Sequence, residues 1–186
     1  MTSKAVLFIQ GGGPGAHAAD GLLADSLKHA LGAGYDVHFP RMPEEDEPDF
    51  ARWLPQIDAA LAHLKGDVTL VGHSLGGAAL LRYLSQPPAR PARVTGLVLL
   101  AAPAWDGQRW AFDDLLLPAD LADRLAAIPR LAFYHCRDDE VVPFAHLALH
   151  GAKLPRAALC ALEVGGHQFG NDLSRVAADI QAGEAV

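Results

Sequence analysis

Short apolar runs alternate with longer stretches of helical period along the chain. The short runs are predicted strands, because turn residues bound them and they are too short to form helices. The six predicted strands cover residues 5–10, 35–39, 68–72, 94–101, 131–135 and 158–164. Helical periodicity is found at residues 16–31, 50–64, 75–86, 118–127, 144–154 and 172–181. This alternation predicts βαβ units, and therefore an α/β fold with a six-stranded, mostly parallel sheet and helices on both faces.

Length and composition are those of an ordinary globular domain. The chain has 186 residues, of which 51% are hydrophobic and 20% are charged. That composition is far from the polar, charge-rich composition of disordered chains. No internal repeat and no Ser/Gly-rich linker divides the chain. We therefore expect one domain over residues 1–186.

Charge and the N-terminal pattern narrow the choice of partners. The formal net charge is -7, which repels nucleic acid and anionic membrane surfaces. The first residues, Met1 to Lys4, lead straight into a strand without the apolar stretch and cleavage site of a signal peptide. No apolar run reaches the roughly 18 residues that a membrane-spanning helix requires. We expect a cytoplasmic protein that binds neither nucleic acid nor membranes.

One short motif carries the chemistry of a nucleophile. Residues 72–76, Gly-His-Ser-Leu-Gly, match the pattern G-x-S-x-G between a predicted strand and a predicted helix. In that context the serine lies on a tight turn, and its hydroxyl projects at a helix N-terminus, where free N–H groups stabilise a developing negative charge. Ser74 is therefore the predicted nucleophile.

The partners of an activated serine follow it in the order that this fold uses, which is serine, acid, histidine. The predicted strand at 131–135 is followed by Asp138 and Asp139, and the last strand is followed by Gly165-Gly166-His167. Loops at the carboxyl ends of parallel strands carry the sites of such sheets. We predict His167 as the general base and Asp139, rather than Asp138, as the acid that orients it.

The other late histidines are less suited to the role of a base. His146 and His150 lie in a predicted helix and are expected at the surface. His135 ends a strand, and we expect it to be structural.

A glycine-rich stretch at residues 11–15 follows the first strand. Acyl transfer needs two N–H donors for the developing oxyanion, and we predict the amides of Leu75 and Gly12. The same stretch fits G-x-G-x-x-A, the dinucleotide-binding pattern, with Arg41 placed to meet a 2′-phosphate. A dinucleotide-binding oxidoreductase is therefore a competing interpretation, but it leaves the later motifs unexplained.

With these residues placed, the chain resembles the small serine hydrolases of the α/β-hydrolase superfamily, specifically the compact group that includes the retinoblastoma-binding serine hydrolase and its bacterial relatives. The resemblance rests on the glycine-rich first loop, Trp53-Leu54, the 72–76 motif, the Asp138-Asp139 pair with Pro143, and Gly166-His167. It covers nearly the whole chain. It implies a triad of Ser74, Asp139 and His167 on a six-stranded core.

These features together predict a carboxylesterase-like serine hydrolase that cleaves an ester or similar acyl bond of a small molecule through an acyl-enzyme on Ser74. The chemistry requires no metal and no organic cofactor. A catalytically silent protein-interaction module on the same fold is the alternative from another class.

Two segments admit two interpretations each. The acidic stretch at residues 44–47 is a solvated connector or, alternatively, a rim of the active-site mouth. Residues 104–128, which include Trp105, Trp110 and Phe112, either pack under a short connection or form an apolar acyl pocket or small lid.

Overall fold

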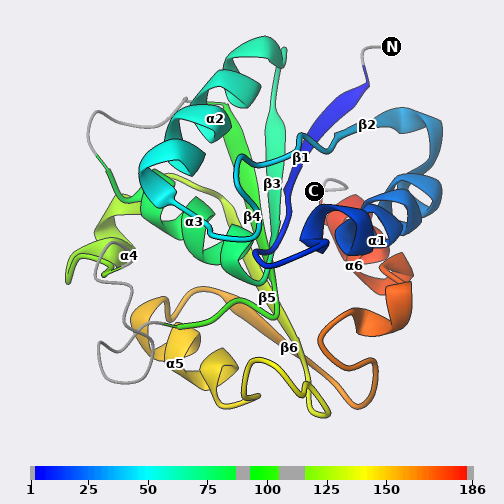
Figure 1. Ribbon diagram of the computed structural model, residues 1–186. Coiled ribbons are helices and arrows are strands. Elements are labelled where there is room, and N and C mark those ends of the chain that lie inside the picture. Colours follow the sequence, from blue (N-terminus) through cyan, green and yellow to red (C-terminus); the bar gives the residue numbers. More distant parts are fainter. Residues whose placement is uncertain (1–2, 87–92, 105–115, 184–186) are drawn as a thin grey trace.

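The predicted strands form one parallel sheet in the computed structural model, which describes residues 3–86, 93–104 and 116–183 (Figure 1). The strands are β1 (Lys4–Ile9), β2 (Tyr35–His38), β3 (Val68–His73), β4 (Val94–Leu100), β5 (Arg130–Cys136) and β6 (Ala158–Leu162). Their order across the sheet is β2-β1-β3-β4-β5-β6, and every neighbouring pair is parallel. The predicted α/β architecture is confirmed.

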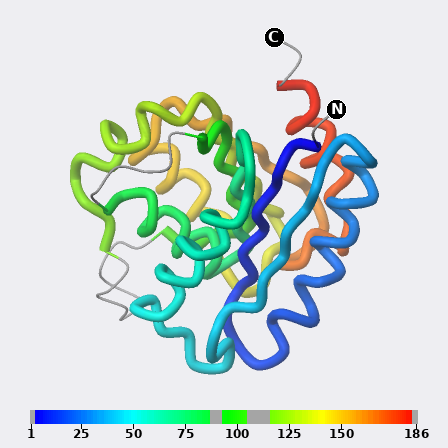
Figure 2. The backbone as a smooth tube through the Cα atoms, turned by 90° about the horizontal axis from the view of Figure 1, so that it is seen from above, coloured from blue at the N-terminus to red at the C-terminus, as the bar shows by residue number. Residues whose placement is uncertain are grey.

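Helices cover both faces of the sheet. On one face lie α1 (Ala16–Leu31) and α6 (Ser174–Ala182), and on the other lie α2 (Phe50–His63), α3 (Leu75–Leu84) and α5 (His146–Lys153). Figure 2 shows the layers from above, with α1 on one side of β1 and the α2–α3 pair on the other. None of the helices in the described ranges is long and apolar enough to cross a membrane.

Alternation along the strands divides the core into two layers. In β1, Leu7 and Ile9 pack toward α2 and α3, whereas Val6 and Phe8 pack toward α1 and α6. Because both faces are covered, the central strands carry almost continuous apolar runs rather than an apolar/polar alternation. All six residues of β3 are buried, so the strand that leads to Ser74 is fixed from both sides.

The predicted helix at 118–127 is shorter in the structure. Only α4 (Leu121–Arg124) is helical, and the backbone then continues in i→i+3 turns, with the Ala126 amide bonded to Asp123 and the Ile128 amide bonded to Leu125. Pro129 disfavours helical geometry at Ile128, the residue before it. Leu121, Leu125 and Ile128 are still buried, so the apolar period was correct although the helix is brief.

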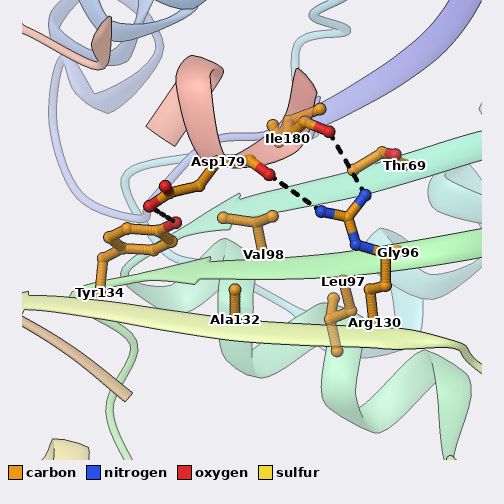
Figure 3. A pocket seen from close by; sticks show the side chains of 9 residues that line it. All are labelled: Thr69, Gly96, Leu97, Val98, Arg130, Ala132, Tyr134, Asp179 and Ile180. Atoms are coloured by element: carbon orange, nitrogen blue, oxygen red, sulfur yellow. Dashed lines mark hydrogen bonds between the residues drawn. The ribbon is translucent and has the colours of Figure 1, made fainter. Parts of the chain in front are cut away.

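A small cavity of about 40 Å³ lies between α6 and the three strands β3, β4 and β5 (Figure 3). Arg130 closes it by donating to the backbone carbonyls of Asp179 (2.9 Å) and Ile180 (3.3 Å), and the Tyr134 hydroxyl donates to the Asp179 carboxylate (2.8 Å). The arginine thus adds donors to carbonyls in the last turn of α6, where the Asp179 carbonyl also accepts from the Gly183 amide (3.3 Å). Thr69, in the cavity wall, lies on β3, five residues before Ser74. The cavity is therefore distinct from the candidate site, about 16 Å along the strand.

The surface position predicted for His150 is wrong. Its side chain is 3% exposed, its Nε2–H donates to the carbonyl of Ala102 (3.0 Å), and its ring packs edge-on against Phe133. Burial lowers the pKa of His150 to about 4, against the opposing effect of the bond to Ala102. His146 is half-buried, and its Nδ1 accepts from the Ala104 amide (2.9 Å). Both histidines of α5 therefore hold the segment that follows β4 by hydrogen bonds to its backbone.

We expect His150 to make stability depend on pH between about 4 and 6.5. In this range an unfolded histidine takes up a proton, whereas His150 stays neutral in the folded protein. The unfolded state then binds more protons, so the free energy of unfolding is highest above pH 6.5 and falls as the pH drops toward 4, by at most about 1.4 kcal/mol per pH unit. His150→Gln should flatten this dependence in urea unfolding, and His29→Gln, on the exposed side of α1, should not. Equal slopes in the two variants would contradict the expectation.

Candidate active site

Ser74 lies on a strained turn where β3 passes into α3. Its backbone has φ 50° and ψ -124°, a conformation that a residue with a Cβ rarely adopts and that costs about 1–3 kcal/mol. The Ser74 amide donates to the carbonyl of Leu100 at the end of β4 (2.8 Å), which anchors the turn. A Cβ on Gly76 would collide with the carbonyl oxygens of Ile9 and Gln10. The second glycine of the motif is therefore required by the close approach of α3 to the end of β1.

His167 and Asp139, predicted from separate loops, meet in the structure. His167 Nδ1 is 2.9 Å from Asp139 Oδ2 and 3.1 Å from Oδ1. The carboxylate accepts, so Nδ1 carries the proton and Nε2 of the neutral ring is left with a free lone pair. The Asp139 side chain is fully buried and that of His167 is 10% exposed. This is the orientation that a histidine base requires.

Asp139 is held by more donors than the sequence suggested. The amides of Val141 (2.8 Å) and Val142 (2.9 Å) donate to Oδ1, and His135 Nε2 lies 3.1 Å from Oδ2. Burial by itself raises the pKa of Asp139, but the bonds from His135, His167 and the two amides outweigh burial and hold this pKa far below its usual range. His135 is structural as predicted, and it also fixes the acid.

Asp138 has a different task from Asp139. Its two carboxylate oxygens accept from the amides of Gly165 (3.1 Å) and Gly166 (2.9 Å), and Glu140 accepts from the amide of His167 (3.3 Å). Gly166 has φ 60°, where a side chain would be strained. Three consecutive acids after β5 therefore hold the loop after β6, one through the imidazole and two through the backbone.

His73, the residue before Ser74, connects the loop that carries His167 to the turn. His73 Nε2 donates to the backbone carbonyl of His167 (3.0 Å), and the two imidazole rings lie 4.7 Å apart between centroids. Within the described residues, neither the Ser74 hydroxyl nor His167 Nε2 has a hydrogen-bond partner in the protein. Bonds of this kind often tighten only when substrate is bound.

The glycine-rich loop lies beside the N-terminus of α3. A Cβ on Gly12 would meet the side chains of Leu75 and Pro48. The amides of the flanking glycines are occupied: Gly11 donates to Asp20 Oδ2 (2.7 Å) and Gly13 donates to the Glu45 carbonyl (2.6 Å). Among the residues that the structure describes, the amide N–H groups of Gly12 and Leu75 donate to no protein acceptor.

The same contacts disfavour a dinucleotide at this loop. A pyrophosphate needs free amides at the start of the helix after the first strand. Here the Gly11 amide donates to the Asp20 carboxylate, and the His17 amide donates to the Glu45 carboxylate (2.7 Å). Arg41, the candidate for a 2′-phosphate, pairs with Glu45 instead (2.6 Å). Two fixed carboxylates would also repel an anionic ligand.

A family model decides which family this geometry belongs to. The model described as "Serine hydrolase" matches residues 25–171, a range that contains Ser74, Asp139 and His167. The chain belongs to the serine hydrolase family. A search of curated proteins by sequence gives no match.

Solved structures similar to this serine hydrolase share its fold. The ydeN gene product from B. subtilis has a TM-score of 0.76 at 21% identity, with 100% of both chains covered. A structure from the metagenome-derived lipolytic enzymes LipS and LipT has a TM-score of 0.73 at 18% identity, covering 97% of this chain and 93% of that one. Est1E from Butyrivibrio proteoclasticus has a TM-score of 0.70 at 15% identity, covering 98% and 86%. At these identities the likeness establishes the α/β-hydrolase fold.

The acidic stretch of this serine hydrolase is only partly a solvated connector. Glu44, Asp46 and Glu47 are exposed, but Glu45 is 8% exposed. Its carboxylate accepts from Gln10 Nε2 (2.9 Å), from the His17 amide and from Arg41. Burial raises the pKa of Glu45, and these three donors more than compensate, so the pKa is lowered. The connector interpretation is wrong for Glu45, which ties the stretch to the glycine-rich loop.

Residues 105–115 lie outside the part of the chain that the structure describes. They include Trp105, Trp110 and Phe112, the candidates for an acyl pocket or a lid. Ala104, which precedes them, is held by His146 as described above.

We expect Glu45→Gln to lower the melting temperature by a few degrees. The amide keeps the shape of the side chain, but it replaces one acceptor oxygen by a donor, which would face either the His17 amide and Gln10 or the guanidinium of Arg41. Thermal unfolding followed by circular dichroism measures the effect. Glu47→Gln, at an exposed position of the same stretch, is the matched control and should unfold like the wild type. A similar small effect of both substitutions would return Glu45 to the role of a surface charge.

Proposed function

We propose that this serine hydrolase cleaves carboxylic esters of small molecules through an acyl-enzyme on Ser74, with His167 as the general base and Asp139 as the residue that orients it. The observation that carries the proposal is the His167–Asp139 pair, whose ring lies against His73, the residue before the strained Ser74. The adjacent residue His73 thus links a serine in this backbone conformation to a histidine with one ring nitrogen fixed and the other free, and these are the groups that nucleophilic catalysis requires.

The reaction has two halves. Ser74 Oγ attacks the ester carbonyl while His167 Nε2 takes its proton, and the same imidazolium then donates that proton to the leaving alkoxide. Water, deprotonated by His167, releases the acid and regenerates Ser74. Asp139 keeps the proton on Nδ1 in both halves and stabilises the imidazolium. The amides of Leu75 and Gly12 would bind the oxyanion, with the positive end of the α3 dipole beside it.

The preference for esters draws on what is printed for the structural neighbours. LipS and LipT are described as lipolytic enzymes, and PytH, which is 18% identical with a TM-score of 0.69, is described as a pyrethroid hydrolase. We infer that this chain also takes a small ester, and that it belongs to the compact subgroup that includes the retinoblastoma-binding serine hydrolase. A single domain over residues 1–186 and a cytoplasmic location stay predictions from the sequence. An intact His167–Asp139 pair disfavours the silent interaction module.

We expect a fluorophosphonate to label this chain once, on Ser74. The probe reacts with a serine whose hydroxyl is activated by a neighbouring base, so mass spectrometry of the tryptic adduct identifies the nucleophile directly. Ser74→Ala should abolish both labelling and p-nitrophenyl acetate hydrolysis, whereas Ser85→Ala, at the end of α3, should retain both. An adduct on another serine, or no adduct with a folded protein, would refute the proposal.

Asp139→Asn should lower kcat by about 10³- to 10⁴-fold with little change in KM. An asparagine amide donates to Nδ1 and so favours the tautomer that carries its proton on Nε2, which cannot act as a base. Asp138→Asn is the matched control, because it changes an adjacent acid that contacts only backbone amides, and we expect a loss within about tenfold. Initial rates on p-nitrophenyl acetate separate the two. A larger loss for Asp138→Asn would transfer the orienting role to Asp138.

A further inference from the structure

A second buried aspartate–histidine pair lies behind the candidate triad. Asp20 of α1 and His73 at the end of β3 are each 1% exposed, and His73 Nδ1 is 2.9 Å from Asp20 Oδ2. We propose that Asp20 and His73 are positioning residues that fix the His167 loop and the glycine-rich loop around Ser74 and place a positive charge behind the His167 ring. The proposal rests on the function proposed above.

Asp20 joins segments that are far apart in the sequence. Its Oδ2 accepts from the Gly11 amide (2.7 Å) and from His73, and its Oδ1 accepts from Gln168 Nε2 (3.1 Å). His73 in turn donates from Nε2 to the carbonyl of His167 (3.0 Å). One carboxylate therefore touches the loop after β1, the residue before the nucleophile and the residue after the base.

The hydrogen bonds also determine where the protons lie. The carbonyl of His167 can only accept, so His73 Nε2 carries a proton. Asp20 already accepts from an amide N–H and from the Gln168 side chain, which favours an ionised carboxylate, so the proton shared with His73 lies on Nδ1. Burial raises the pKa of Asp20, but the bonds from His73, Gly11 and Gln168 lower it further than burial raises it. The pair is thus an imidazolium and a carboxylate, neutral as a whole, with the positive ring toward His167.

Charged groups around this pair are few, and their positions give the sign of its effect. His73 faces Asp20 from α1 and the His167 ring at 4.7 Å from the loop after β6, and Phe169 supplies an uncharged ring at 6.4 Å. Asp139 and Glu140, from the loop after β5, bond to His167 on its ring and its backbone amide. A positive His73 opposes protonation of His167, so it favours the neutral base.

Asp20→Asn tests the inference because it keeps the shape of the side chain and removes its charge. Without the negative charge, His73 becomes neutral and its repulsion of a protonated His167 disappears. The amide also replaces one of the two acceptor oxygens by a donor, so either the bonds from Gly11 and His73 or the bond from Gln168 is lost. We expect kcat to fall about 10- to 100-fold with KM within threefold of the wild type. The acidic limb of the kcat/KM–pH profile should move to higher pH by about half a unit. Asp25→Asn, at an exposed position of α1, is the control and should match the wild type in both.

A second variant keeps the test independent of folding. His73→Gln retains a side-chain amide able to reach the His167 carbonyl but carries no charge, so it should move the acidic limb in the same direction. In a His73→Gln background, Asp20→Asn should have less than a third of the effect on kcat that it has alone, because its main partner is gone.

The outcomes separate this inference from the proposed function. If the wild type neither takes up the fluorophosphonate nor hydrolyses p-nitrophenyl acetate, the proposed function fails. If the wild type is active but both folded variants keep the wild-type acidic limb, or Asp20→Asn keeps the wild-type kcat, then the positioning role is overturned and the proposed function stands. A fall in melting temperature alone, with an unchanged pH profile, would also overturn it.

Discussion

The close approach of α3 to the end of β1 is the constraint on which the site depends. At Gly76 the helix backbone touches the carbonyls of Ile9 and Gln10, so there is no room for a side chain. That contact sets the tilt at which β3 turns into α3, and the turn holds Ser74 at a positive φ of 50°. It also brings the glycine-rich loop beside Leu75. The positions of the proposed nucleophile and of the two candidate oxyanion amides therefore depend on one backbone-to-backbone contact in the centre of a parallel sheet.

Carboxylates hold the loops that surround Ser74 in place. Asp139 holds the imidazole of His167, and Asp138 and Glu140 hold the backbone of its loop. The Glu45 carboxylate binds residues on either side of the glycine-rich loop, and Asp20 contacts both loops. Loops at the carboxyl edge of a parallel sheet have few backbone partners of their own, and an ionised carboxylate can accept several N–H bonds at once. Acidic side chains thus hold these loops in place, as backbone hydrogen bonds between strands do inside the sheet.

The sequence was sufficient for features that are local or that follow from chain order. The strands and helices follow from apolar period, Ser74 follows from a motif of five residues in its strand-to-helix context, and the pairing of His167 with Asp139 was predicted from the order in which acid and base follow the serine. The roles of Asp20, Glu45 and His150 could not be predicted. Each is a polar residue in a stretch that tolerates polar residues at its surface, and each has partners that only the fold supplies: 53 residues separate Asp20 from His73, and 48 separate His150 from Ala102. The helical period places Asp20 on the same face of α1 as Leu23 and Leu27, but it does not identify the residues that this aspartate contacts.

The bonds of Asp20 also bear on the order in which the molecule matures. Gln168 lies 148 residues after Asp20, and the His167 carbonyl lies 94 residues after His73. During synthesis, β1, β3 and the turn at Ser74 can assemble once β4, whose Leu100 carbonyl anchors the turn, has left the ribosome. The proposed base, His167, cannot arrive until β6 and its following loop have been made and have closed onto α1. A nascent chain would therefore carry a strained but inert serine, and catalytic competence would mark the last closure of the fold rather than the formation of its core.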